Sequence, residues 1–90
     1  DDHERRLEVL RSLEVGDLIY IPGHVMMVIG YDQGMPYVIH DTTGISYRDG
    51  SGEVRRVVLN GVSVTPFTPL LFARKDPFVD HITSILRVRP

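Results

Sequence analysis

The chain of 90 residues contains no cysteine and no tryptophan. Disulfides and cysteine-based zinc sites are therefore excluded, and a core must come from Val, Ile and Leu with few aromatic rings. No apolar run approaches the ~20 residues that span a bilayer. The formal net charge is −2, so the chain also lacks a basic field for nucleic acid. We therefore expect no nucleic-acid partner and no transmembrane segment.

The composition is that of one small globular domain, with 42% hydrophobic and 24% charged residues. The charged opening at residues 1–6 is unlike a signal peptide, and we interpret it as a trimmed or processed end whose targeting signal lies outside the chain. Glycines accompany turn residues and never form GxGxxG or a P-loop. No cofactor and no bound metal are expected.

Apolar periodicity and turn signals predict an α+β fold. Leu7, Leu10 and Leu13 form a stripe at helical spacing near the start of the chain. An antiparallel sheet of about five or six strands should follow, with most sequence neighbours paired. The expected strands are residues 18–21, 25–31, 37–41, 45–48, 53–59 and a closing strand within 82–88. Asn60-Gly61, between Leu59 and Val62, is the strongest short hairpin signal in the chain.

The segment 25–31 is nearly all apolar, so we expect this strand to be covered on both faces. One short helix cannot shield both faces of the sheet. The face that bears His24 should therefore be poorly covered by this chain alone, and a partner chain or a homo-oligomeric contact is expected over it. Arg55-Arg56, in the strand 53–59, are expected on a solvated face.

His24 and His40 each lie at the edge of an apolar run. A hairpin centred near Asp32 would place the two histidines directly opposite each other on one face, with Cβ atoms about 5 Å apart. A two-residue turn at Gln33-Gly34 would instead pair His40 with Met27 and put the histidines on opposite faces. The sequence leaves both registers open.

The spacing allows three interpretations of this histidine pair. The two rings can act as a base and its polar partner, or each can be an ordinary, partly buried histidine with one hydrogen bond. With Asp41 they can also ligate zinc, although no compact ligand spacing such as HExxH is present. His3 and His81 lie in polar stretches and are expected to be solvated.

Three short sequence motifs occur in order along the chain. Residues 16–21 are Gly-Asp-Leu followed by a short apolar strand. Residues 24–30 are His-Val followed by an apolar strand and Gly. Residues 37–41 form a strand that ends in Ile-His-Asp. In order, spacing and strand context they resemble the NlpC/P60 family of papain-like cysteine peptidases, over roughly residues 7–48. The resemblance implies that residues 1–90 are a single partial domain, the C-terminal, histidine-bearing part of a papain-like fold.

By that resemblance, His24 corresponds to the catalytic base and His40 to the polar third residue. The family's nucleophile is a cysteine at the start of a helix, some tens of residues before the Gly-Asp-Leu motif. This chain has no cysteine. A thiol becomes a good nucleophile when an imidazole and a helix N-terminus lower its pKa, while a third group holds the imidazole tautomer. The chain alone is therefore expected to be inactive.

The resemblance further implies part of a bacterial cell-wall hydrolase, of the γ-D-glutamyl-diamino-acid endopeptidase type, that acts in the periplasm, in the cell envelope or after secretion. Its expected partners are a peptidoglycan stem peptide and a cysteine-bearing N-terminal half, on a separate chain or in a missing segment. A non-catalytic β-rich module that binds cell-wall peptide or a protein partner is the alternative. A Cys followed by a small residue, encoded before Asp1 at a helix start, would favour the enzyme.

Overall fold

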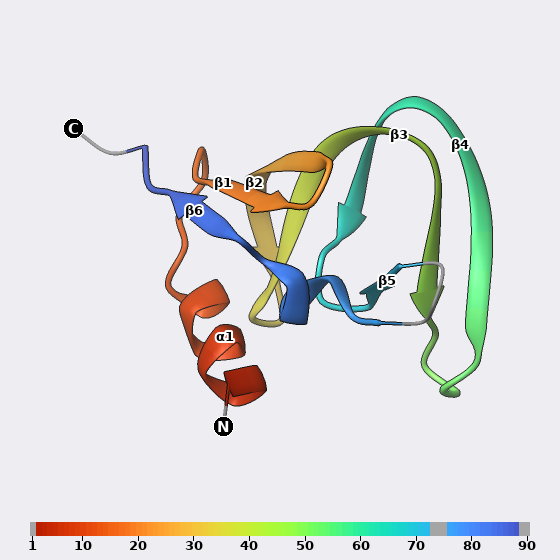
Figure 1. The fold of residues 1–90 in the computed structure, drawn as a ribbon, viewed down its shortest axis with the longest axis horizontal. Helices are drawn as coiled ribbons and strands as arrows, with labels where there is room; N and C mark the ends of the chain where they lie inside the picture. Colours follow the sequence, from red (N-terminus) through yellow and green to blue (C-terminus); the bar gives the residue numbers. More distant parts are fainter. Residues whose placement is uncertain (1, 73–75, 89–90) are drawn as a thin grey trace.

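The computed structural model describes residues 2–72 and 76–88, which form a curled antiparallel sheet with one short N-terminal helix (Figure 1). The expected α+β architecture is confirmed at that level. The elements are α1 (Asp2–Arg11), β1 (Leu18–Ile21), β2 (His24–Asp32), β3 (Met35–Arg48), β4 (Val54–Pro66), β5 (Leu70–Leu71), η1 (Phe78–His81) and β6 (Ser84–Leu86).

The sheet has the strand order β4-β3-β2-β1-β6, and β5 pairs with β3 beside this path. The first four strands form the expected meander, whereas β6 returns from the end of the chain to pair with β1. An isolated bridge between Leu71 and Pro77 adds a seventh extended segment to the six strands of the described residues. The expected count of five or six strands was therefore too low.

The hairpin predicted at Asn60-Gly61 is absent, because β4 runs through both residues without reversing. Gly61 has a φ of 117° and pairs with Thr42, while Gly44 pairs with Val58, so the ladder contains a bulge at this point. The β3–β4 pairing on both sides of Asn60 outweighs its local turn preference. The dipeptide thus marks the bend where the long β3–β4 pair curls over (Figure 1).

A two-residue turn at Gln33-Gly34 joins β2 to β3, and it is closed by the pair Asp32 and Met35. The turn residues have φ values of 53° and 77°, as a type I′ hairpin turn requires. In a regular ladder, this turn would place His24 and His40 on opposite faces of the sheet.

An extra residue in β2, Ile29, prevents that outcome. It forms a bulge that moves the pairing by one, so that Met27 pairs with Ile39 and not with His40. His24 and His40 consequently share a face and are offset diagonally across the two strands. Neither alternative register is therefore correct: the two-residue turn forms, and the bulge still brings the histidines together.

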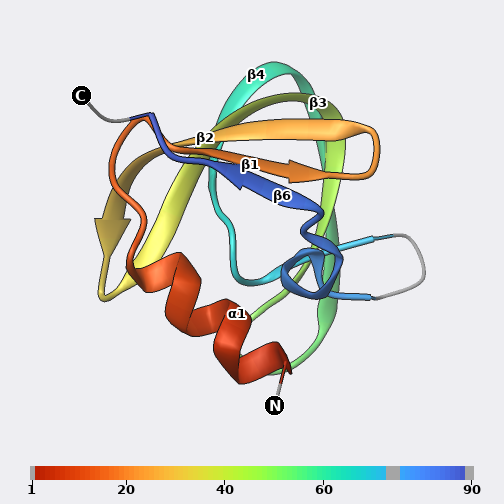
Figure 2. The ribbon, with the colours of Figure 1, turned by 60° about the vertical axis from the view of Figure 1, so that its left-hand side comes forward.

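The core lies on the concave side of the sheet, where α1 and η1 pack (Figure 2). It consists of Leu10, Leu13, Ile19, Ile21, Met26, Val28, Val38, Phe67, Leu70 and Val79. The Tyr31 hydroxyl donates to the carbonyl oxygens of Leu10 and Leu13, at 2.7 and 2.6 Å, and so ties the end of α1 to β2. No helix among the described residues is both long and apolar enough to cross a membrane.

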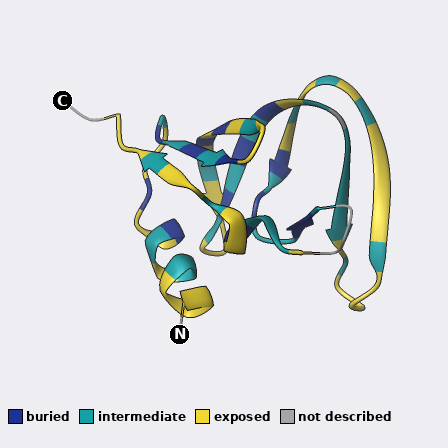
Figure 3. Ribbon diagram, viewed as in Figure 1, coloured by how far each residue is buried: buried dark blue, intermediate teal, exposed yellow. Residues whose placement is uncertain are grey.

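The strand β2 is buried on one face only, so the expectation of cover on both faces was wrong. Met26 and Val28, on the face of His24, are 1% and 0% exposed, whereas Val25 and Met27 on the opposite face are 49% and 41% exposed. The expectation that the His24 face lacks cover was also wrong, because the chain's own core fills it. Figure 3 shows the buried, intermediate and exposed positions along the strands.

Candidate functional site

His24 is the first residue of β2 and follows the tight turn at Pro22-Gly23. Gly23 has a φ of 76°, which glycine adopts without strain, and the turn closes with the pair Ile21 and His24. This position leaves the His24 ring half-buried at the edge of the concave face. A ring at such an edge can contact the interior and still meet a substrate.

His40 lies within β3, between the neighbouring strands β2 and β4, and only 4% of it is exposed. It pairs with Ser63 of β4. A polar side chain this deep in the core needs hydrogen-bond partners, because an unsatisfied buried group destabilises the fold. Both ring nitrogens of His40 have such a partner.

The two histidines are in direct contact. Nε2 of His24 lies 3.2 Å from Nδ1 of His40, within hydrogen-bond distance. The ring centroids are 5.4 Å apart and the planes meet at 79°, an edge-to-face arrangement. The structure therefore brings together the two residues that the sequence selects as candidate catalytic residues.

Thr65 of β4 extends the contact into a third strand. Its Oγ1 lies 2.9 Å from Nε2 of His40, and the residue is 6% exposed. His24, His40 and Thr65 thus form a hydrogen-bonded relay that crosses β2, β3 and β4. Sequence reasoning missed Thr65, because its relation to His40 depends on a strand pairing 25 residues apart.

The relay admits two arrangements of its protons. In the first, His24 donates through Nε2–H to Nδ1 of His40, and His40 donates through Nε2–H to Thr65. In the second, Thr65 donates to His40 and His40 donates to His24, which then carries its proton on Nδ1. Only the first leaves a lone pair on Nδ1 of His24, so only the first makes that nitrogen a base.

Replacing Thr65 with valine should change the balance between the two tautomers of His40. The change keeps the shape of the side chain but removes the oxygen, so Nε2 of His40 loses its partner inside the core and the free energy of unfolding should fall by about 1–3 kcal/mol. Nitrogen-15 NMR of the His40 ring should then show tautomer populations that differ from those of the wild type. Thr65→Ser should retain the wild-type ring spectrum, and the same spectrum in Thr65→Val would exclude Thr65 from the relay.

Burial lowers the pKa of His40, and the nearby His24 ring lowers it further. His40 therefore stays neutral near pH 7 and can serve as a hydrogen-bond partner without adding charge to the core. This depressed pKa also links the stability of the fold to pH.

Acidification should destabilise the domain through His40. The unfolded chain, with a histidine pKa near 6.5, binds a proton more readily than the folded chain does. The free energy of unfolding should thus fall as pH drops below about 6.5, by at most about 1.4 kcal/mol per pH unit for this one proton. Urea titrations between pH 7.5 and 5 should show a shallower pH dependence for His40→Gln, and an unchanged slope would contradict the assignment.

A hollow of about 440 Å³ adjoins the relay. Phe78 connects the two, because it lines the hollow and its ring centroid lies 6.5 Å from that of His24. The lining consists of Gly44, Ile45, Ser46, Arg56, Leu71, Phe72 and Phe78. The lining combines apolar and aromatic side chains with the polar residues Ser46 and Arg56, a combination that small-ligand sites also use.

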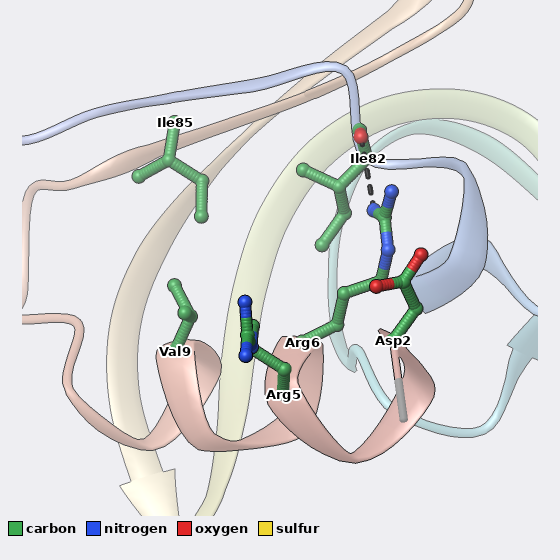
Figure 4. A pocket seen from close by; sticks show the side chains of 6 residues that line it. All are labelled: Asp2, Arg5, Arg6, Val9, Ile82 and Ile85. Atoms are coloured by element: carbon green, nitrogen blue, oxygen red, sulfur yellow. Dashed lines mark hydrogen bonds between the residues drawn. The ribbon is translucent and has the colours of Figure 1, made fainter.

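A second hollow, of about 260 Å³, lies between α1 and the segment that leads into β6 (Figure 4). Arg6 lines it and donates through Nη1 to the carbonyl oxygens of Val79 and Ile82. Neither histidine of the relay lines this hollow. Its Arg6 contacts tie α1 to the C-terminal segment, which is a structural role.

The remaining polar candidates lie outside the relay. Asp41 is exposed and neighbours His40 on the alternate face, so it does not join the histidines as a third zinc ligand. Within residues 2–72 and 76–88 there is no group of three or more potential metal ligands. His3 Nδ1 lies 2.7 Å from Asp80 Oδ1, and His81 packs edge-on against Phe72 with ring centroids 5.1 Å apart, both at exposed positions.

No family model matches the chain, and a search of curated proteins likewise found no match.

Proposed function

We propose that the chain is the histidine-bearing part of an NlpC/P60-like cysteine peptidase that hydrolyses amide bonds in peptidoglycan stem peptides, of the γ-D-glutamyl-diamino-acid type. The observation that carries the proposal is the contact between His24 and His40. The resemblance assigns these two residues as base and orienting partner, and their ring nitrogens lie 3.2 Å apart. A periplasmic, cell-envelope or secreted location follows from the resemblance.

The geometry suits a base that serves a thiol supplied from outside the described residues. Nε2 of His24 is engaged by His40, and no described residue forms a hydrogen bond with Nδ1 of His24. That nitrogen would take the proton of the cysteine and later return it to the leaving amine. His40, itself held by Thr65, would fix the His24 tautomer and stabilise the imidazolium that forms.

The test uses the protein with the residues encoded before Asp1, and compares it with residues 1–90 alone. The longer protein should cleave a purified L-Ala-γ-D-Glu-diaminopimelate tripeptide between the last two residues, and residues 1–90 should not. Iodoacetamide should abolish the cleavage by alkylating the nucleophile. Peptide binding without turnover by the longer protein would favour the alternative, a non-catalytic module that binds cell-wall peptide.

A further inference from the structure

Arg56 is one of the residues that line the hollow beside the relay. It pairs with Ser46 across the β3–β4 ladder, and both residues line the hollow. A Cβ added at Gly44 would come within 2.9 Å of Nη2 and 3.2 Å of Cζ of Arg56. The absence of a side chain at Gly44 therefore makes room for the guanidinium, which comes to lie close against the strand backbone.

Arg56 differs from its neighbour Arg55 in its charge environment. Arg55 donates through Nε to Asp49 Oδ2 at 2.8 Å, and its Nη2 lies 3.6 Å from Glu53 Oε2. The Arg55 guanidinium keeps the pKa of Asp49 well below its usual range. Among the described residues, by contrast, Arg56 forms no ion pair. The positive charge of the hollow is thus left available to an anion.

The other walls suit the apolar part of such a ligand. Phe72 and Phe78 pack together with ring centroids 4.6 Å apart, and both line the hollow. The ligand would therefore carry an anionic group for Arg56 beside an aliphatic stem for the two rings. A planar carboxylate matches the fork of N–H groups on a guanidinium.

We propose that this hollow is a substrate subsite in which Arg56 binds a carboxylate of a peptide whose reacting amide lies at His24. The inference rests on the proposed function for the position of the reacting bond. Gly44 lies four residues from His40 along β3, which is at most about 13 Å because the bulge between Thr42 and Gly44 bends the strand. That separation favours a carboxylate at the end of a long side chain, such as that of diaminopimelate, over the α-carboxylate of the adjacent D-glutamate.

The test measures peptide binding to residues 1–90 by NMR titration, which needs no nucleophile. The probes are L-Ala-γ-D-Glu-diaminopimelate, the same peptide with lysine in place of diaminopimelate, and the same peptide with D-isoglutamine in place of D-glutamate. A charge-assisted hydrogen bond is worth about 1.5–3 kcal/mol, or roughly ten- to hundredfold in Kd. The lysine peptide should bind the wild type weaker by about that factor.

Arg56→Gln should remove the preference for diaminopimelate, and Arg56→Lys should keep part of it, because a lysine retains the charge but not the fork. Arg55→Gln is the matched control: it changes the net charge equally and should leave the preference intact. The D-isoglutamine peptide could instead be the one that binds more weakly, and only to proteins that contain Arg56. That result would support the subsite and assign it to the glutamate carboxylate. Equal binding of all three probes, or equal effects of Arg55→Gln and Arg56→Gln, would overturn the subsite.

Hydrolysis by the longer protein is measured separately, so the two proposals fail independently. Turnover without a carboxylate preference at Arg56 would remove the subsite and keep the peptidase. An Arg56-dependent preference without turnover would keep the subsite and remove the peptidase.

Discussion

Replacing His24 with alanine in the cysteine-bearing protein should lower the rate of stem-peptide hydrolysis by about 10²- to 10⁴-fold, the usual contribution of a general base. Without the imidazole, a cysteine with an ordinary pKa of about 8.5 is mostly protonated at neutral pH. The leaving amine also loses its proton donor. Turnover of the purified tripeptide, followed by chromatography of the products, measures the effect.

Two other histidines control for this result. His3→Ala and His81→Ala also remove an imidazole, but both residues are exposed and neither belongs to the relay. Both variants should hydrolyse the peptide at the wild-type rate. A His24→Ala protein with wild-type turnover would show that the assigned base is wrong, whatever the other variants do.

Substitutions at His40 should have smaller effects than those at His24, because they remove the orientation of the base and not the proton acceptor. His40→Asn or His40→Gln should retain more activity than His40→Ala, since an amide can still meet a ring nitrogen of His24. The His40 variants also separate activity from stability. Chemical denaturation of each variant shows how much of its lost turnover comes from unfolding.

The hairpin that carries His24 could be predicted from local sequence, whereas the register that unites the histidines could not. Pro22-Gly23 between two apolar runs indicates a tight turn, and the structure has one there. The bulge at Ile29 has one local signal, because Gly30 follows it and an isolated glycine in a strand often marks a bulge, but that signal does not say which neighbouring residue is left unpaired. Its position depends on which β2 and β3 side chains together fill the core, a property of the paired strands and not of either one.

One wrong prediction and one omission share that cause. Asn60-Gly61 has strong local turn chemistry, but the pairing of β4 with β3 continues on both sides of it. Thr65 has no distinguishing neighbours, yet strand pairing sets it against His40. The local conformational preference of a residue is worth up to about 1 kcal/mol. The many β3–β4 pairs on both sides of Asn60-Gly61 together contribute more than the preference of these two residues.

Replacing Phe67 with alanine should lower the free energy of unfolding by about 3–5 kcal/mol, the range for deleting a buried phenylalanine ring. Phe67 is 0% exposed and is the largest of the fully buried side chains. Its ring also supports Phe78, with centroids 6.2 Å apart, and Phe78 in turn contacts His24. The cavity left by Phe67→Ala would therefore open next to Phe78, the residue that lines the hollow and contacts His24.

The measurement is urea denaturation monitored by circular dichroism, with a lower midpoint expected at an unchanged m-value. Phe67→Leu keeps most of the volume and should cost clearly less than the alanine. Val64→Ala provides a control three residues earlier, on β4: Val64 is 52% exposed, and a surface change of this kind alters stability by about 0.5 kcal/mol or less. Equal losses for Phe67→Ala and Val64→Ala would mean that Phe67 does not occupy the core, and the aromatic wall behind His24 would lose its support.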